Sequence, residues 1–272
     1  TAHRPPFLSL ALFITHNTPT GQPAALLIEN AAESCGILIP KKEELMYRIE
    51  THLHTTYISR CGWLGAEAIM KYYTACGYDA ICVTDHYNRE CFDYAEIDLT
   101  TPGSKTQAFL QGYHRLKKSV RKIQYPRICG CRNCVLTNRT TITCCTAFTM
   151  LLADPDRVMR EGLAAFAPQY RADGALLVQA HPFRKNAPPL RLNIWSVEVL
   201  NLNPRHDSHN DLALAYAKEH HLIMTAGSDA TVPGDQGTTG ILSDTLPEDS
   251  FGLADLLRSG NYTIIRPECT ED

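Results

Sequence analysis

The sequence of 272 residues has no uninterrupted apolar run of the roughly 18–20 residues that a membrane-spanning helix requires, so we expect no membrane partner. It also lacks a strong charge of either sign. Its 26 lysines and arginines stand against 29 aspartates and glutamates, which gives a formal net charge of −3. Without a basic stripe or an aromatic platform, we expect no nucleic-acid partner. Hydrophobic residues make up 44% of the chain, which is enough for a sizeable globular core.

Clusters of cysteine are also scarce, because outside one stretch the cysteines lie singly. Scattered cysteines suit a reducing cytoplasm, where they act as small buried hydrophobes, and we expect a cytoplasmic protein. The alternative is secretion, since the apolar run from Phe7 to Ile14 resembles a signal-peptide core, but no clear cleavage site follows it. The single cysteines are Cys35, Cys61, Cys76, Cys82, Cys91 and Cys269.

From residue 47 onward, short apolar runs alternate with longer amphipathic runs, which favours a parallel α/β architecture. The predicted strands cover residues 47–54, 79–86, 174–182, 196–201 and 222–230. The predicted helices cover residues 66–76, 107–122, 154–170, 209–221 and 250–260. Residues 1–45 do not share this alternation. They end in KKEEL just before Met46, and we expect a translated leader or a disordered extension there.

The predicted strands share one feature, which is that each ends in polar residues. In α/β barrels the chemistry collects at the carboxyl ends of the strands. His52 and His54 also point to the same side of a strand because its side chains alternate with a period of two. Any one of these residues could begin an ordinary loop, but five strands that end alike indicate a site. The strand-end residues are His54, His86, His181, Asn201 and Asp229.

Four motifs occur in a fixed order: THLHT, VTDH, AHPF and GSDA. Together they resemble the polymerase and histidinol phosphatase (PHP) family of metal-dependent phosphoesterases, over roughly residues 46–265. CGW at residues 61–63, VTDHYN and RSGNYTII resemble a bacterial subgroup of that family. The resemblance implies a distorted, TIM-like (β/α)7 barrel over residues 46–267, with two or three divalent metal ions at its mouth. Imidazole and carboxylate ligands suit Zn²⁺, Mn²⁺ or Fe²⁺.

Carried over by position, the resemblance assigns His52, His54 and Asp229 to a first metal ion, His181 to a second and His86 to a third. Asp85 would either support a metal ligand or handle a proton, and Arg184 would bind the substrate phosphate and assist catalysis. Arg205 and His206 follow the strand at 196–201 and are expected to bind substrate at the same mouth. Glu198, within that strand, stays open between a structural and a catalytic role.

The resemblance implies a hydrolase that cleaves a small phosphorylated metabolite or nucleotide through a metal-bound hydroxide. Two positions depart from the family. Thr231 stands where the family has a histidine ligand of the third metal ion, and Arg132 stands where it has a glutamate that bridges two ions. Fewer bound ions are therefore expected. The alternative is a degenerate PHP fold with impaired metal binding, acting as a ligand-binding or non-catalytic protein.

Arg132 lies in the one cysteine-rich stretch, between Ile128 and Cys145. Three interpretations stay open: a zinc site, a divergent segment, and a segment (128–150) translated out of frame. The spacing is unusual for zinc. A CGG-AAT codon pair for Arg132 and Asn133 would contain GAA, the codon for the missing glutamate, in another frame. Sequencing the gene tests this hypothesis. The stretch contains Cys129, Cys131, Cys134, Cys144 and Cys145.

Overall fold

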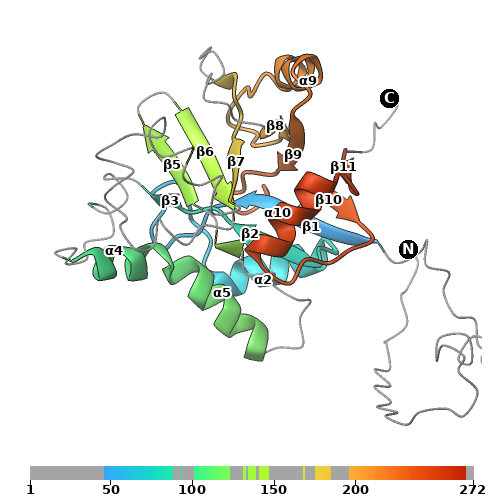
Figure 1. Ribbon diagram of the computed structural model, residues 1–272. Helices are drawn as coiled ribbons and strands as arrows, with labels where there is room; N and C mark the ends of the chain where they lie inside the picture. The colour runs from blue at the N-terminus through green and yellow to red at the C-terminus, as the bar shows by residue number, and fades with distance from the viewer. Residues whose placement is uncertain are drawn as a thin grey trace, which may run out of the picture. The chain divides into compact units, whose positions relative to one another are not determined.

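A computed structural model describes residues 46–87, 101–122, 131–132, 134–138, 141–146, 175–184 and 196–267, with the single positions 93 and 168 (Figure 1). The expected extension at residues 1–45 lies outside the described residues, and so does nearly all of the helix predicted at 154–170. None of the helices in the described ranges is both long and apolar enough to cross a membrane.

The first sheet has the strand order β11-β10-β1-β2-β4. Its strands are β1 (Tyr47–Leu53), β2 (Ala80–Val83), β4 (Cys131–Arg132), β10 (Gly240–Ser243) and β11 (Thr263–Ile265). β1, β2 and β4 run parallel to one another, whereas β10 pairs antiparallel with both β1 and β11. The parallel strands therefore end at one edge of the sheet, where the polar motifs begin.

The second sheet has the order β3-β5-β6-β7-β8-β9. Its strands are β3 (His86–Tyr87), β5 (Cys134–Asn138), β6 (Thr141–Thr146), β7 (Leu176–Gln179), β8 (Ser196–Asn201) and β9 (Ile223–Gly227). β7, β8 and β9 are parallel, as predicted, but β6 is antiparallel to both of its neighbours. Only two residues separate β5 from β6, and such a short connection can join antiparallel strands only.

The mixed α/β class is thus confirmed, but the described strands lie in two sheets that do not close into one barrel. The cysteine-rich stretch supplies β4, β5 and β6, and the structure describes only its backbone pairing. The zinc interpretation of that stretch depends on side chains that lie outside the described residues.

Within the described ranges, five helices with defined bounds accompany the strands. They are α2 (Ala66–Ala75), α4 (Pro102–Phe109), α5 (Gln111–Lys122), α9 (Asn210–Glu219) and α10 (Ser250–Ser259). The Asp249 side chain caps the start of α10, and Gly260, with a φ of 72°, ends it. Thr101 and Ser104 form a capping box at the start of α4. The single helix predicted at 107–122 is divided at Leu110 into α4 and α5.

Two buried clusters hold the sheet ends in place. Leu53 and Val83 pack with Ile69 and Tyr73 of α2 and with Leu116 of α5. The other cluster joins β1, β2, β7 and β10 to α10 and includes the fully buried Cys82, which behaves as the small hydrophobe that its isolated position predicted. The carboxyl ends of β1 and β2 are therefore anchored on their helix-facing side.

Gly112 of α5 lies against the polar edge of the core. A Cβ atom there would lie 2.3 Å from Asp85 Oδ2 and 2.4 Å from Thr55 Oγ1. We expect Gly112→Ala to lower the free energy of unfolding by about 1–3 kcal/mol, because overpacking must displace buried groups. Urea unfolding measures this change. Gly103→Ala in α4 is the matched control, since its Cβ would meet only Thr101 Oγ1, at 3.9 Å. Equal stability of the two variants would contradict the tight packing at Gly112.

Candidate metal centre

The ends of β1 and β9 lie side by side and carry the central residues of the site. A parallel bridge joins Leu53 to Ala230, and the backbone N–H of His54 donates to the Ala230 carbonyl at 3.1 Å. Gly227 allows this close approach, because a Cβ at that position would lie 2.2 Å from the His52 Cβ. The strand ends thereby bring His52 and His54 next to Asp229.

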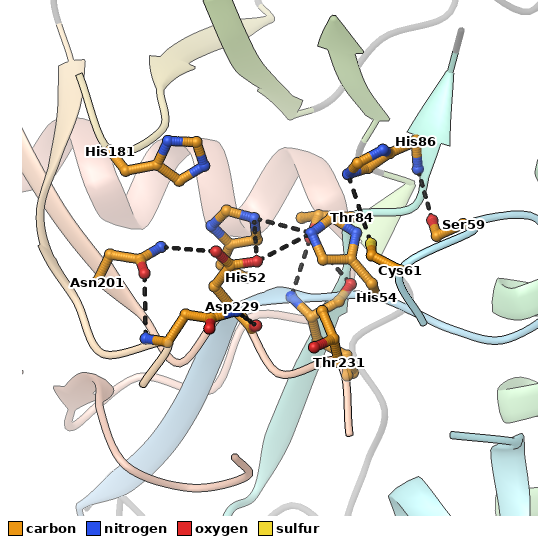
Figure 2. A network of polar contacts seen from close by, with 12 residues as sticks. His52, His54, Ser59, Cys61, Thr84, His86, His181, Asn201, Asp229 and Thr231 are labelled. Carbon is orange, nitrogen blue, oxygen red and sulfur yellow. Dashed lines mark hydrogen bonds and ion pairs between the residues drawn. The ribbon is translucent and has the colours of Figure 1, made fainter. Parts of the chain in front are cut away.

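These three side chains form a buried cluster (Figure 2). The Nε2 atoms of His52 and His54 lie 3.2 Å apart. Asp229 Oδ1 lies 3.4 Å from His52 Nε2 and 3.1 Å from His54 Nε2. The residues that the resemblance assigned to a first metal ion are thus brought together, with three ligand atoms facing one point.

His181, at the end of β7, stacks on His52 with ring centroids 5.8 Å apart. One ligand atom each of His52, His181 and Asp229 lies within 4.8 Å of the others. His181 and Asp229 have φ values of 30° and 49°, in the left-handed region that non-glycine residues rarely adopt. Such backbone strain is concentrated at functional sites, where the surrounding structure holds it in place.

Glu198 of β8 orients two of these histidines. Its Oε1 lies 2.8 Å from His52 Nδ1, and its Oε2 accepts from the His181 backbone N–H at 2.9 Å. The Asn201 side chain donates to the same Oε2 at 2.9 Å. Both oxygens therefore receive hydrogen bonds from groups around the metal ligands, which favours a supporting role for Glu198.

The charges of the cluster are strongly coupled. Burial opposes protonation of His52, but Glu198 and Asp229 raise its pKa to about 9. Burial would raise the pKa of Asp229, but His52 and His54 hold it well below its usual value. Burial, assisted by Arg184, lowers the pKa of His181 to about 3. The surroundings of His181 thus favour the neutral form, which is the form that binds metals, whereas the carboxylates around His52 favour its protonated form.

We expect Glu198→Gln to weaken metal binding by about 10- to 100-fold, the usual effect of losing a group that orients metal ligands. Both carboxylate oxygens accept hydrogen bonds, so the amide nitrogen of glutamine must face a donor, either at His52 or at His181. Metal titration followed by calorimetry measures the loss. Glu248→Gln, at an exposed position, should leave the affinity unchanged. An unchanged affinity in Glu198→Gln as well would rule out the orienting role.

Glu50 is a second supporting carboxylate, which the motifs did not reveal. It is fully buried and accepts hydrogen bonds from the backbone N–H groups of His52 and Ser228, at 2.9 and 3.1 Å, and from the Tyr73 hydroxyl at 2.8 Å. Burial raises its pKa to about 7. The sequence feature that could have revealed Glu50 is its position two residues before His52. Strand side chains alternate with a period of two, so both side chains lie on one face of β1.

Asp85 follows β2 and is buried. Its carboxylate accepts from the Thr55 backbone N–H and hydroxyl, both at 2.7 Å, and from the Ser59 hydroxyl at 2.8 Å. Burial raises its pKa. Its hydrogen bonds fix the segment after β1, and the predicted proton-handling role stays a prediction.

His86 starts β3, and its ring packs edge-on against that of His54, with centroids 4.5 Å apart. Burial, followed by the charge of His54, holds its pKa well below the usual value. Cys61 Sγ lies 3.9 Å from His86 Nε2. His54, Cys61 and His86 form a second group whose ligand atoms lie within 4.8 Å of one another. Cys61 was missed because it was counted among the scattered cysteines, although CGW lies in the segment between the His-x-His strand and α2.

Arg184 is tied to the cluster through a single nitrogen. Its NH2 donates to Asp229 Oδ2 at 2.9 Å, to Asn201 Oδ1 at 2.7 Å and to Ser208 Oγ at 3.0 Å. This nitrogen holds Oδ2 of Asp229, whereas Oδ1 of the same carboxylate faces the imidazoles. A contact to phosphate, as predicted, would use the remaining nitrogens.

Arg205 and His206 are exposed and follow β8. The Arg205 guanidinium pairs with both oxygens of Asp235, at 3.0 and 2.6 Å, and also donates to the Thr231 hydroxyl. Thr231 is thus held by Arg205 at the position where the family places its histidine ligand. The role of Arg205 and His206 in substrate binding stays a prediction.

No family model matches the sequence, and no curated protein matches it. Among solved structures, the chain is similar to a two-domain protein from Bacteroides vulgatus that contains a predicted PHP-like metal-dependent phosphoesterase, with a TM-score of 0.59 and 12% identity. The fold is PHP-like. The match covers 81% of this chain and 65% of the Bacteroides chain, so it spans less than two thirds of that protein.

A second solved structure, PsfC from Pseudomonas syringae, is similar with a TM-score of 0.54 and 18% identity, over 82% of this chain and 92% of the other. The clustered side chains form one candidate site at the strand ends. Its donors are imidazole nitrogens and a carboxylate, a set that divalent transition ions accept. The buried Nδ1 of His54 has no hydrogen-bond partner among the described residues, which also fits a site built for an ion.

Proposed function

We propose that this chain is a metal-dependent phosphoesterase that hydrolyses a small phosphorylated metabolite or nucleotide. The observation that carries the proposal is the buried cluster of His52, His54 and Asp229, with His181 beside it. Four candidate ligands from three strand ends converge on one place in a PHP-like fold. A purely structural cluster would not require three imidazoles and a carboxylate aimed at one another within a protein interior.

The residues fit two ions, which we propose to be Zn²⁺, Mn²⁺ or Fe²⁺. His52, His54 and Asp229 would hold the first, with His181 contributing to a second. When bound, such ions lower the pKa of water and neutralise charge on phosphoryl oxygens. The protein groups do the positioning: Glu198 orients His52, and Arg184 fixes the far oxygen of Asp229. We further propose that Asp85 handles a proton and that Arg184, Arg205 and His206 contact the substrate.

The finer architecture is also part of the proposal. We infer that residues 46–267 form one domain and that its strands approach a distorted (β/α)7 barrel. The bridge between Leu53 and Ala230 supports this, because it brings β1 of one sheet next to β9 of the other. β2 and β3 follow each other directly and pair with β4 and β5, which links the sheets on the opposite side. The scattered cysteines support a cytoplasmic location.

A second candidate is a degenerate PHP fold with impaired metal binding that acts as a ligand-binding or non-catalytic protein. Two observations favour it. Arg132 pairs with Val83 in the backbone register of β4 and β2, at the strand end that leads to Asp85 and His86. Thr231 binds Arg205 instead of offering an imidazole. A cation at this edge opposes the binding of divalent ions.

A screen of phosphomonoesters and nucleotides, with Mn²⁺ or Zn²⁺ added to the full chain, distinguishes the phosphoesterase from the degenerate fold. Metal-dependent release of phosphate together with at least one tightly bound ion per chain supports the phosphoesterase. A chain that binds neither ion and releases no phosphate from any compound is the degenerate fold. Ions bound without any hydrolysis would refute the proposed activity while retaining the metal centre.

A further inference from the structure

We propose that Cys61, His54 and His86 form a separate thiolate–imidazole site for a zinc-class ion, beside the cluster around Asp229. This inference rests on the proposed metal centre, because it shares His54 with it. The PHP resemblance implies that His86 and a second histidine bind a third ion, but Thr231 stands at the position of that second histidine. The structure assigns the role of the missing ligand to the sulfur of Cys61, which lies beside His86.

The distances suit an ion of this class. Cys61 Sγ and His86 Nε2 lie 3.9 Å apart, and a ring nitrogen of His54 lies within 4.8 Å of both. A tetrahedral zinc ion with bonds of about 2.3 Å to sulfur and about 2.0 Å to nitrogen separates these ligand atoms by about 3.5 Å. Small side-chain adjustments would therefore close the site, without any change in the backbone.

His54 lies between the two clusters. In Figure 2 its ring separates His52 and Asp229 on one side from Cys61 and His86 on the other. Its Nε2 faces Asp229 Oδ1, whereas its buried Nδ1 has no hydrogen-bond partner in the part of the chain that the structure describes. A buried ring nitrogen without a partner is costly, and an ion is one of the few ligands that satisfies it.

The loop that carries Cys61 is fixed. The Gly62 N–H donates to the Ser59 carbonyl at 2.8 Å, and the Trp63 N–H donates to the Thr231 carbonyl at 2.7 Å. A Cβ at Gly62 would lie 2.3 Å from the Thr55 carbonyl oxygen, so the loop packs directly on the segment after β1. The backbone that carries the sulfur is therefore held in place before any ion arrives.

An ion pair limits the positive charge close to Cys61. Arg205, whose charge interacts with Cys61, makes a two-oxygen contact with Asp235. His86 is held by the Ser59 hydroxyl, which accepts from its backbone N–H at 2.8 Å. A sulfur ligand favours zinc over manganese or magnesium, whereas the neighbouring cluster has only nitrogen and oxygen ligands. We therefore expect the two sites to prefer different ions.

Cobalt(II) alone is a suitable probe, because sulfur bound to Co²⁺ gives a near-ultraviolet charge-transfer band. The full chain titrated with Co²⁺ should show this band, and Cys61→Ser should lose it together with one bound ion. Cys61→Asp should bind the ion again without the band. Cys76→Ser, at an exposed cysteine away from the site, should keep both band and stoichiometry. A band intensity and a number of bound ions that are both unchanged in Cys61→Ser overturn the proposal and place the thiolate at another cysteine.

The same experiment separates this inference from the proposed function. If the full chain shows no sulfur band but phosphate release depends on Asp229, only the Cys61 site is wrong. If Cys61→Ser loses the band while the full chain releases no phosphate from any compound, only the proposed activity is wrong. The circular dichroism spectra of Cys61→Ser and Cys61→Asp must match that of the unmodified chain. Renewed ion binding by Cys61→Asp then shows that the ion lost in Cys61→Ser was not lost through unfolding.

Discussion

Asp229→Asn should lower metal-dependent phosphate release by at least about 100-fold, because ion binding supplies several kcal/mol of charge stabilisation and each 1.36 kcal/mol is a factor of ten. Asp229 Oδ1 faces His52 and His54, while Oδ2 accepts from Arg184 and Asn201. An asparagine must present its amide nitrogen either to the ion or to the guanidinium. Both arrangements remove an attraction that the buried carboxylate provides.

The measurement is the rate of phosphate release together with metal content by elemental analysis. Asp211→Asn is the matched control, because this carboxylate is exposed in the first turn of α9. It should behave as the unmodified chain. A normal rate and a normal metal content in Asp229→Asn would remove the central observation behind the proposed activity.

The parts of the site that lie on regular strands were predictable from sequence. His52 and His54 share a face because strand side chains alternate, and the Leu53–Ala230 bridge then brings them to Asp229. The elements β8, α9, β9 and α10 also agree with the predicted ranges to within a few residues, because each has an apolar pattern and a clear end, such as Gly260. The strands β10 and β11 were not predicted. Local rules suffice where neighbouring residues decide the outcome.

The missed features depend on contacts between distant residues. Nothing near Glu198 in the sequence reveals that its oxygens reach His52 and the His181 backbone. The antiparallel pairing of β6 depends on which strand lies beside it, and not on its own apolar pattern. Cys61 has the composition of an ordinary core cysteine, and only the loop fixed by Thr231 places it beside His86.

Arg132→Glu should strengthen the binding of divalent ions by about 10- to 100-fold, the range over which groups around a metal centre change its affinity. The register of β4 and β2 places the backbone of residue 132 beside Val83, and Thr84 and Asp85 follow at the same edge. The substitution removes a positive charge and adds a negative one. Repulsion of each bound ion therefore falls and attraction to it rises. The substitution also supplies the carboxylate that the PHP resemblance expects at this position.

Arg132→Gln separates the two contributions, because it removes the positive charge without adding a ligand. If glutamate acts as a ligand, Arg132→Glu should bind at least one more ion than Arg132→Gln, with a higher rate of phosphate release. If only repulsion matters, the two variants should be equal and both should exceed the unmodified chain. Lys118→Glu, on the exposed side of α5, makes the same change of charge away from the site and should have no effect. Equal metal binding in the unmodified chain and in all three variants would show that residue 132 is too far from the metal centre to affect it. The pairing of β4 with β2 would then not influence ion binding.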